Sequence, residues 1–221
     1  MNARTERHTV AGPAGAIECA VDRPDPVQGP VRGVALVCHP HPLHGGTMDN
    51  KVVMTLARAA LHRGWVSLRL NFRGIGASAG AWDEGRGEID DAMAVLAARE
   101  VLGLPRQGLV VAGFSFGGAV ASRVAARQAQ LGEPPAAVLL VAPAVVNFAV
   151  AALPAGSTVV HGEADEVVPL AAVLAWARPL AQPVTVVPGA GHFFHGQLPL
   201  LKQLAIGALA ASDALNTHPD A

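Results

Sequence analysis

The sequence has few of the features that mark secreted or nucleic-acid-binding proteins. Only two of its 221 residues are cysteines. Cys38 lies in an apolar run, so a buried free thiol is expected and no disulfide framework is implied. The net charge is −1 with no block of either sign, which argues against nucleic acid as a partner, because phosphate binding needs a concentrated face of Lys and Arg. The N-terminal stretch has no apolar core of the signal-peptide kind, so a cytoplasmic location is expected.

A long hydrophobic helix is also missing. Residues 134–162 carry no charge, but prolines, an asparagine and a glycine divide them into pieces of strand length. A membrane-spanning helix needs about 20 continuous apolar residues, so no membrane span is expected. No internal repeat, low-complexity linker or shift in composition marks a domain boundary. Residues 1–221 are therefore expected to form one domain, with a flexible tail over about 213–221.

The chain does contain a regular alternation of apolar strands and helical patterns. This alternation predicts an α/β fold, with a mostly parallel sheet covered by helices on both faces. Chemistry in such sheets collects at the carboxyl ends of the strands. Strands are expected at 31–39, 65–72, 108–114, 136–143, 157–162 and 183–189, helices at 50–64, 88–102, 117–130, 169–180 and 198–211, and an antiparallel edge hairpin within 8–23.

The expected strand 108–114 runs into the pattern Gly-x-Ser-x-Gly, centred on Ser115. Ser115 could be a nucleophile on a tight turn, or a small residue where a strand bends into a helix. A serine on such a turn adopts a strained backbone conformation and leaves little room for a Cβ atom at Gly113 or Gly117. The free N–H groups at the start of the next helix would face an anion beside the serine.

A nucleophilic serine needs a base and a group that orients the base, and in this arrangement an acid and then a histidine follow it in the chain. The strand 157–162 leads to Glu163 and Asp165, and the strand 183–189 leads to His192 and His195. We favour Asp165, which can reach across from its loop, and His192, which follows a glycine turn directly. The alternatives are a helix N-cap for Asp165 and a packed loop histidine for His192.

The first strand ends in the loop 39–46, which is rich in histidine, proline and glycine. Acyl transfer needs two N–H donors that face the developing oxyanion: one from Phe116, the residue after the nucleophile, and one from this loop. Pro40 and Pro42 have no N–H to donate.

Two other ligands are considered and rejected. His39, His41 and His44 suggest a zinc site, but they lie on an irregular loop with only Asp49 nearby, so histidines that hold the turn together are the better interpretation. Residues 74–79 match the dinucleotide pattern G-x-G-x-x-A, yet no helix is expected to begin there. No metal or cofactor is expected.

Taken together, these motifs resemble the α/β-hydrolase superfamily over the whole chain, and within it a small, uncapped, bacterial-type subgroup of serine hydrolases with the HPHPLHGG loop. The resemblance implies Ser115, Asp165 and His192 as a catalytic triad. His39-Pro40 takes the place of the His-Gly of many relatives, so the loop's oxyanion donor becomes the backbone of His41, beside Phe116. The motifs are HPHPLHGGTMDNKVV (39–53), NFRGIGASAG (71–80), GEIDDA (87–92), GFSFGG (113–118), HGEADEVVP (161–169) and PGAGHFFHG (188–196).

The resemblance also implies that Arg73 and Glu88 matter for the loops, and an ion pair between them is expected. Larger relatives insert a cap where this chain has only the connection 144–156, so no cap domain is expected. The expected activity is hydrolysis of small-molecule carboxylic esters or thioesters. The alternatives are a peptidase or C–C bond hydrolase with the same triad, or a non-catalytic binding protein on this fold. The oligomeric state stays open between monomer and homodimer. Six residues are candidates for an apolar substrate pocket, with ordinary packing as the alternative: Leu43, Met48, Trp82, Phe148, Val167 and Phe193.

Overall fold

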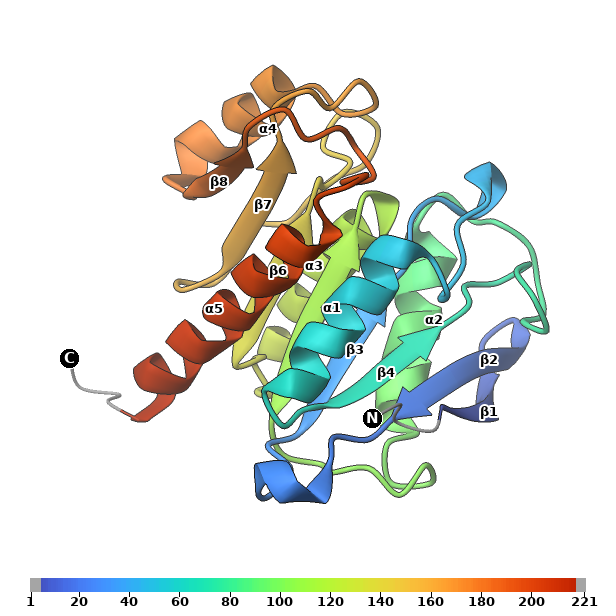
Figure 1. The fold of residues 1–221 in the computed structure, drawn as a ribbon. Helices are drawn as coiled ribbons and strands as arrows, with labels where there is room; N and C mark the ends of the chain where they lie inside the picture. The colour runs from blue at the N-terminus through green and yellow to red at the C-terminus, as the bar shows by residue number, and fades with distance from the viewer. Residues whose placement is uncertain (1–4, 218–221) are drawn as a thin grey trace.

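The computed structural model describes residues 5–217, which form a single eight-stranded sheet flanked by helices (Figure 1). The first two strands form the expected antiparallel hairpin at one edge, and the second of them also pairs antiparallel with β4. All other neighbours are parallel. The order is β1-β2-β4-β3-β5-β6-β7-β8, with β1 at Glu6–Gly12, β2 at Gly15–Asp22, β3 at Val34–Cys38, β4 at Val66–Leu70, β5 at Leu109–Phe114, β6 at Ala137–Val141, β7 at Thr158–Gly162 and β8 at Val184–Val187.

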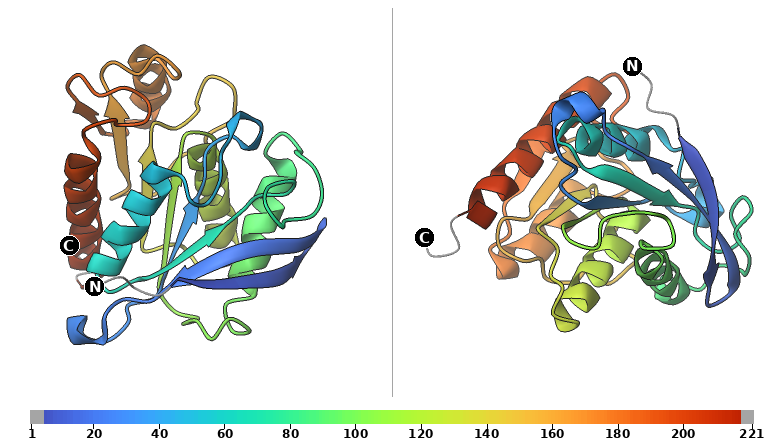
Figure 2. Two further views of the ribbon diagram at one scale, coloured as in Figure 1. Left: turned by 45° about the vertical axis from the view of Figure 1, so that its right-hand side comes forward. Right: turned by 90° about the horizontal axis from the view of Figure 1, so that it is seen from below.

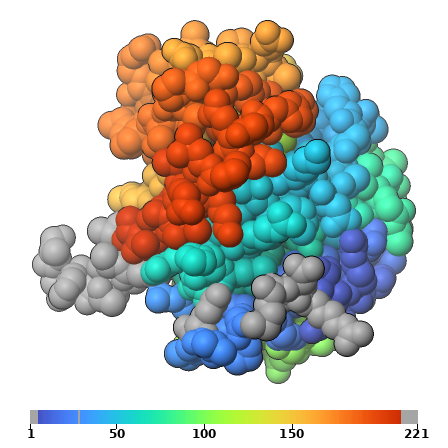
Figure 3. Space-filling model, viewed as in Figure 1, coloured from blue at the N-terminus to red at the C-terminus, as the bar shows by residue number. Residues whose placement is uncertain are grey.

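Helices cover both faces of this sheet (Figures 1 and 2). One face carries α1 (Lys51–His62) and α5 (Leu198–Thr217), which contact each other, and their side chains close that face in the space-filling view (Figure 3). The other carries α2 (Arg86–Ala97) and α3 (Phe116–Gln130), whose buried residues share one core cluster with α4 (Leu170–Ala177). The predicted α/β fold, mostly parallel and without a cap, is confirmed. Within the described chain, no helix is both long and apolar enough to cross a membrane.

Several helix ends differ from the prediction because tertiary contacts and proline decide them. The helix α2 ends at Ala97 instead of 102, and the buried Arg99 side chain turns back to donate to the Leu96 carbonyl at 3.0 Å. The expected helix 169–180 ends as an α-helix at Ala177, and residues 178–180 form a 3-10 turn that contains Pro179. The last helix continues past 211 to Thr217, and residues 218–221 of the predicted tail lie outside the described residues.

The predicted ion pair between Arg73 and Glu88 is wrong. Arg73 binds Asp91 through two N–H···O bonds of 2.9 and 2.8 Å. Glu88 is fully buried and accepts the backbone N–H groups of Asp83 at 2.9 Å and Gly85 at 2.8 Å. Because the Glu88 oxygens hold the turn that precedes α2, the guanidinium pairs with the acid further along the same helix. Both contacts anchor the loop between β4 and α2 beside the candidate site.

Candidate active site

Ser115 lies between β5 and α3 in a strained backbone conformation, with φ 56° and ψ −119°. Its neighbours leave no room for side chains. A Cβ atom on Gly113 would lie 2.1 Å from the Gly117 carbonyl oxygen, and one on Gly117 would lie 2.3 Å from the Cys38 oxygen. The Ser115 N–H donates to the Val141 carbonyl at 2.9 Å, which ties the turn to β6. The glycines therefore allow a turn that presents the serine side chain at the carboxyl end of the sheet.

Asp165 follows β7, and its two carboxylate oxygens have different partners. Oδ1 accepts the backbone N–H groups of Val167 at 2.9 Å and Val168 at 2.8 Å, whereas Oδ2 faces His192. Burial disfavours the charged form, but the hydrogen bonds from His192 and Val168 outweigh it, so the pKa of Asp165 lies below its ordinary value. Asp165 holds its own loop and caps no helix, because α4 begins only at Leu170.

His192 joins the serine to the acid. Its Nδ1 lies 2.7 Å from Asp165 Oδ2, and its Nε2 lies 3.0 Å from Ser115 Oγ. An ionised carboxylate only accepts hydrogen bonds, so Nδ1 carries the proton and Nε2 is free to accept the serine O–H. The alternative acid Glu163 instead accepts the N–H of Gly189 at 2.9 Å. The structure thus brings together Ser115, His192 and Asp165, all buried, from the loops after β5, β8 and β7.

Two backbone N–H groups are the candidates for an oxyanion site. Phe116 is the first residue of α3, where an N–H has no partner within the helix. His41 precedes a short 3-10 turn, Pro42–His44. Across residues 5–217, no hydrogen bond from either N–H to another protein group is found. Both groups are therefore available to an anion.

The buried His39 holds the loop that carries His41, as the interpretation of the loop histidines predicted, but its partners were not predicted. His39 Nε2 accepts the Phe72 N–H at 3.0 Å, so its Nδ1 carries the proton and donates to the Pro40 carbonyl at 2.6 Å. The Pro40 carbonyl and the His41 N–H belong to one planar trans peptide group, so the direction of one determines that of the other. Burial lowers the pKa of His39 to about 4, which keeps the ring neutral at pH 7.

The same bonds bear on the zinc alternative. Both ring nitrogens of His39 are engaged, and His41 Nδ1 accepts the Leu43 N–H at 3.2 Å. The structure therefore does not present the three loop histidines as a ligand set, and in the part of the chain that it describes no group of three His, Cys, Asp or Glu side chains could hold a metal ion. Residues 74–79, the dinucleotide-like pattern, form turns well before α2 begins.

A histidine missed from the sequence, His161, is fully buried beside Asp165. Its Nε2 lies 2.9 Å from the Val168 carbonyl oxygen and 3.6 Å from Asp165 Oδ2. Burial lowers its pKa, so the neutral ring donates to the carbonyl and holds the turn around the acid. Its position at the end of the predicted strand 157–162 was the one available signal.

The predicted pocket residues divide into three groups. The rings of Trp82 and Phe148 surround the half-buried His41 ring at centroid distances of 4.3 and 5.7 Å. Met48 has no exposed surface that a substrate could touch, so its prediction as a pocket residue is corrected. The other three, Leu43, Val167 and Phe193, are exposed, and only Phe193 has a ring contact with His192, at 5.1 Å.

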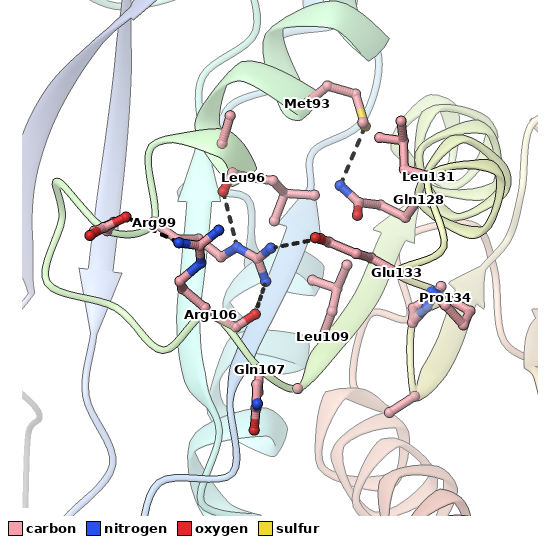
Figure 4. A pocket seen from close by; sticks show the side chains of 15 residues that line it. Met93, Leu96, Arg99, Arg106, Gln107, Leu109, Gln128, Leu131, Glu133 and Pro134 are labelled. Carbon is pink, nitrogen blue, oxygen red and sulfur yellow. Dashed lines mark hydrogen bonds and ion pairs between the residues drawn. The ribbon is translucent and has the colours of Figure 1, made fainter.

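Two hollows stand out, one near the carboxyl ends of the strands and one near their amino ends. A cavity of about 170 Å³ lies between the start of α2, the first turns of α3 and the connection after β6. A larger one of about 1010 Å³ lies at the amino ends of β5 and β6 (Figure 4). The larger hollow is lined by no serine, cysteine or histidine, and the Arg99 guanidinium within it is bound by the carbonyls of Leu96 and Arg106 and by Glu133. Size alone therefore does not identify the active site.

Several known proteins of solved structure are similar to this chain. An α/β serine hydrolase without lid from Xanthomonas campestris is 36% identical over 95% of both chains, with a TM-score of 0.85. A serine hydrolase homologue from Coxiella burnetii is 40% identical over 92% of this chain and 97% of that one, with a TM-score of 0.82. An esterase from Pyrobaculum calidifontis, 18% identical over 96% of this chain and 86% of that one with a TM-score of 0.69, shares the fold.

The search of curated proteins found an uncharacterized protein of Rickettsia prowazekii (strain Madrid E), 39% identical over 120 residues. That match spans 54% of this chain and about half, 49%, of the relative. No family model matches the chain. The two bacterial hydrolase structures nevertheless match it almost from end to end, and both exceed 30% identity. The chain therefore belongs to the α/β serine hydrolases without a lid.

Proposed function

We propose that the protein hydrolyses carboxylic esters or thioesters of small molecules, with Ser115 as nucleophile, His192 as general base and Asp165 as the acid that orients it. The observation that carries this proposal is the continuous chain of contacts from Asp165 to His192 at 2.7 Å and from His192 to Ser115 at 3.0 Å. A buried carboxylate, imidazole and hydroxyl in this order form the arrangement that activates a serine for acyl transfer.

The reaction follows from these positions. His192 Nε2 takes the proton from Ser115 Oγ as the oxygen attacks the acyl carbon. The negative oxygen of the tetrahedral intermediate accepts the N–H groups of His41 and Phe116. His192 then gives its proton to the departing alcohol or thiol, which leaves an acyl group on Ser115. A water molecule repeats the sequence and releases the acid.

Asp165 acts through His192. Because its Oδ1 is held by two backbone N–H groups, its Oδ2 stays directed at His192 Nδ1. This contact keeps the proton on Nδ1, leaves Nε2 as the base, and stabilises the imidazolium that forms when Ser115 attacks. No cofactor takes part in these steps.

The test combines two assays on the wild type and on Ser115→Ala. A fluorophosphonate probe, which reacts with activated serines, should label the wild type alone, and only the wild type should turn over p-nitrophenyl acetate. Ser157→Ala provides a matched control, because that serine lies at the amino end of β7, whereas Ser115 lies at the carboxyl end of β5. The proposal fails if wild type and Ser115→Ala behave alike in both assays.

A panel of peptide, ester and thioester substrates separates the remaining reaction classes. Ester or thioester hydrolysis should exceed peptide hydrolysis, because an alcohol or thiol leaves more readily than an amine. Labelling of Ser115 without turnover of any ester or thioester would instead favour a peptidase or C–C bond hydrolase. An unlabelled, inactive but folded protein would favour a binding role.

A further inference from the structure

The cavity of about 170 Å³ beside α3 has an apolar floor. Four α3 residues line it, Phe116, Ala119, Val120 and Arg123, whose spacing places them along one face of the helix. Ala119 is 4% exposed and Val120 is 1% exposed, and Ile89 of α2, at 7%, faces them. One water molecule needs about 10–15 Å³ of such space, so a cavity of about 170 Å³ admits an acyl chain of several carbon atoms.

The cavity is lined at one end by aromatic rings that also lie beside the His41 ring. The rings of Phe116 and Phe148 line it and lie 4.8 Å apart. The same rings lie 5.4 and 5.7 Å from the His41 ring. Phe116 follows Ser115 directly in the chain, so a residue that lines this end of the cavity is next to the proposed nucleophile.

The mouth of the cavity carries a cation without an acidic partner. Arg86, on the α2 side, is held by Asp83 and Glu84 at 2.9 Å each. Arg123 is exposed on the α3 side, and no ion pair is found for it among residues 5–217. One turn further along α3, Arg127 is paired with Asp90. Arg123 is therefore the guanidinium at this mouth that is available to a ligand anion.

We infer that this cavity binds the acyl chain of the substrate, and that the chain ends in a carboxylate held by Arg123. The substrate class is then a half-ester or half-thioester of a dicarboxylic acid, with an acyl chain of about six carbons. This inference rests on the proposed function, because it assumes that the acyl group is transferred to Ser115. In this arrangement Phe148 flanks the chain, Ala119 lies beneath it, and Arg123 selects its charge.

The test compares three p-nitrophenyl esters: the acetate, the hexanoate and the adipate half-ester, which matches the hexanoate in chain length but ends in a carboxylate. The wild type should prefer the half-ester to the hexanoate by about two- to five-fold in kcat/KM, the range of a solvent-exposed ion pair. Arg123→Gln should bring this ratio to about one. Arg58→Gln, on the exposed side of α1, removes one positive charge at a remote place and should leave the ratio unchanged.

Cavity size is tested separately with Ala119→Leu, which fills the apolar floor. The ratio of kcat/KM for the hexanoate to that for the acetate should fall about ten-fold or more. Ala119 is buried, so circular dichroism checks that this variant folds, whereas Arg123 is exposed and its variant carries no such risk.

The outcomes separate this inference from the function on which it rests. A wild type that prefers the hexanoate, or an Arg123→Gln variant that keeps the half-ester preference, overturns the anionic end of the chain. An unchanged hexanoate-to-acetate ratio in folded Ala119→Leu overturns the cavity as the acyl site. In these cases, acetate hydrolysis that depends on Ser115 still supports the proposed function. No Ser115-dependent hydrolysis of any of the three esters overturns both.

Discussion

The buried His39 ring should control both the stability of the protein and the direction of the His41 N–H. Its Nδ1–H donates to the Pro40 carbonyl, and its Nε2 accepts the Phe72 N–H. Asparagine places an amide nitrogen near the position of Nδ1, and glutamine reaches the position of Nε2 with its amide oxygen. His39→Asn thus keeps the bond to Pro40 and loses the one to Phe72, and His39→Gln does the reverse.

Each variant leaves one buried group unpaired, which costs about 1–3 kcal/mol of the free energy of unfolding at pH 7. Their catalytic effects should differ. When the Pro40 carbonyl is released, its peptide group can turn and the His41 N–H no longer faces the oxyanion. Losing such a donor lowers kcat by up to about 10²–10³-fold. We expect a loss of this kind in His39→Gln and a much smaller one in His39→Asn.

The titration of His39 adds a pH dependence to the stability. Burial, opposed by the bond to Pro40, lowers its pKa from 6.5 to about 4. Below pH 6.5 the unfolded chain takes up a proton that the folded chain does not, so the wild type should lose stability from pH 6.5 down to pH 4. The loss is about 1.4 kcal/mol per pH unit, or about 3 kcal/mol in all. His161 adds a loss of the same sign in every variant, which cancels in the comparison.

Urea unfolding at pH 7 and pH 4 measures the stability difference, and p-nitrophenyl acetate hydrolysis at pH 7 measures kcat. Both variants should show a pH dependence smaller than that of the wild type by about 3 kcal/mol. A His39→Gln variant with wild-type kcat, or equal losses of kcat in the two variants, would refute the role of the Pro40 bond. An unchanged pH dependence would show that His39 is not kept neutral by burial.

Three further predictions follow from the site. Gly117→Ala should lower the free energy of unfolding by about 1–3 kcal/mol and lower kcat, because its Cβ would lie 2.3 Å from a backbone oxygen. Gly207→Ala is the control: its Cβ would have nothing within 4 Å, so this variant should unfold at a higher temperature than the wild type. Asp165→Asn should lower kcat by roughly 10³–10⁴-fold in a folded protein, because the backbone keeps the amide oxygen and the amide nitrogen then meets His192 Nδ1. His41→Pro fits the observed φ of −53° but removes the backbone N–H. Its kcat should therefore be about 10²-fold below that of His41→Ala. Equal kcat values in the two variants would exclude this N–H as an oxyanion donor.

The predicted strands, most helix starts and the antiparallel hairpin could be derived from the sequence because hydrophobic periodicity and glycine placement are local. The position of Ser115 follows from the same signals. Since parallel strands place their carboxyl ends along one edge, the sequence also predicted which loops would meet there. Asp165 was chosen for the reach of its loop and His192 for the glycine turn before it. In the structure, His192 lies within hydrogen-bonding distance of both Asp165 and Ser115.

Contacts between distant segments could not be derived in this way. Arg73 had several acids within reach along the chain, and only the packing of α2 against the loop after β4 selects Asp91. Met48 has the apolar character of a pocket residue, but its burial depends on how its loop packs. The role of His39 depends on the Phe72 N–H that the fold places beside its Nε2, and that of His161 depends on the Val168 carbonyl.

The sequence by itself therefore determined the order of the strands and helices and the loops that carry the reactive side chains, because backbone sterics and burial act over a few residues. Only the tertiary structure decided which partner each buried polar group takes and where the proposed acyl cavity lies. Those features depend on segments as far apart as Ile89, Phe116 and Phe148, whose distances in space no local pattern encodes.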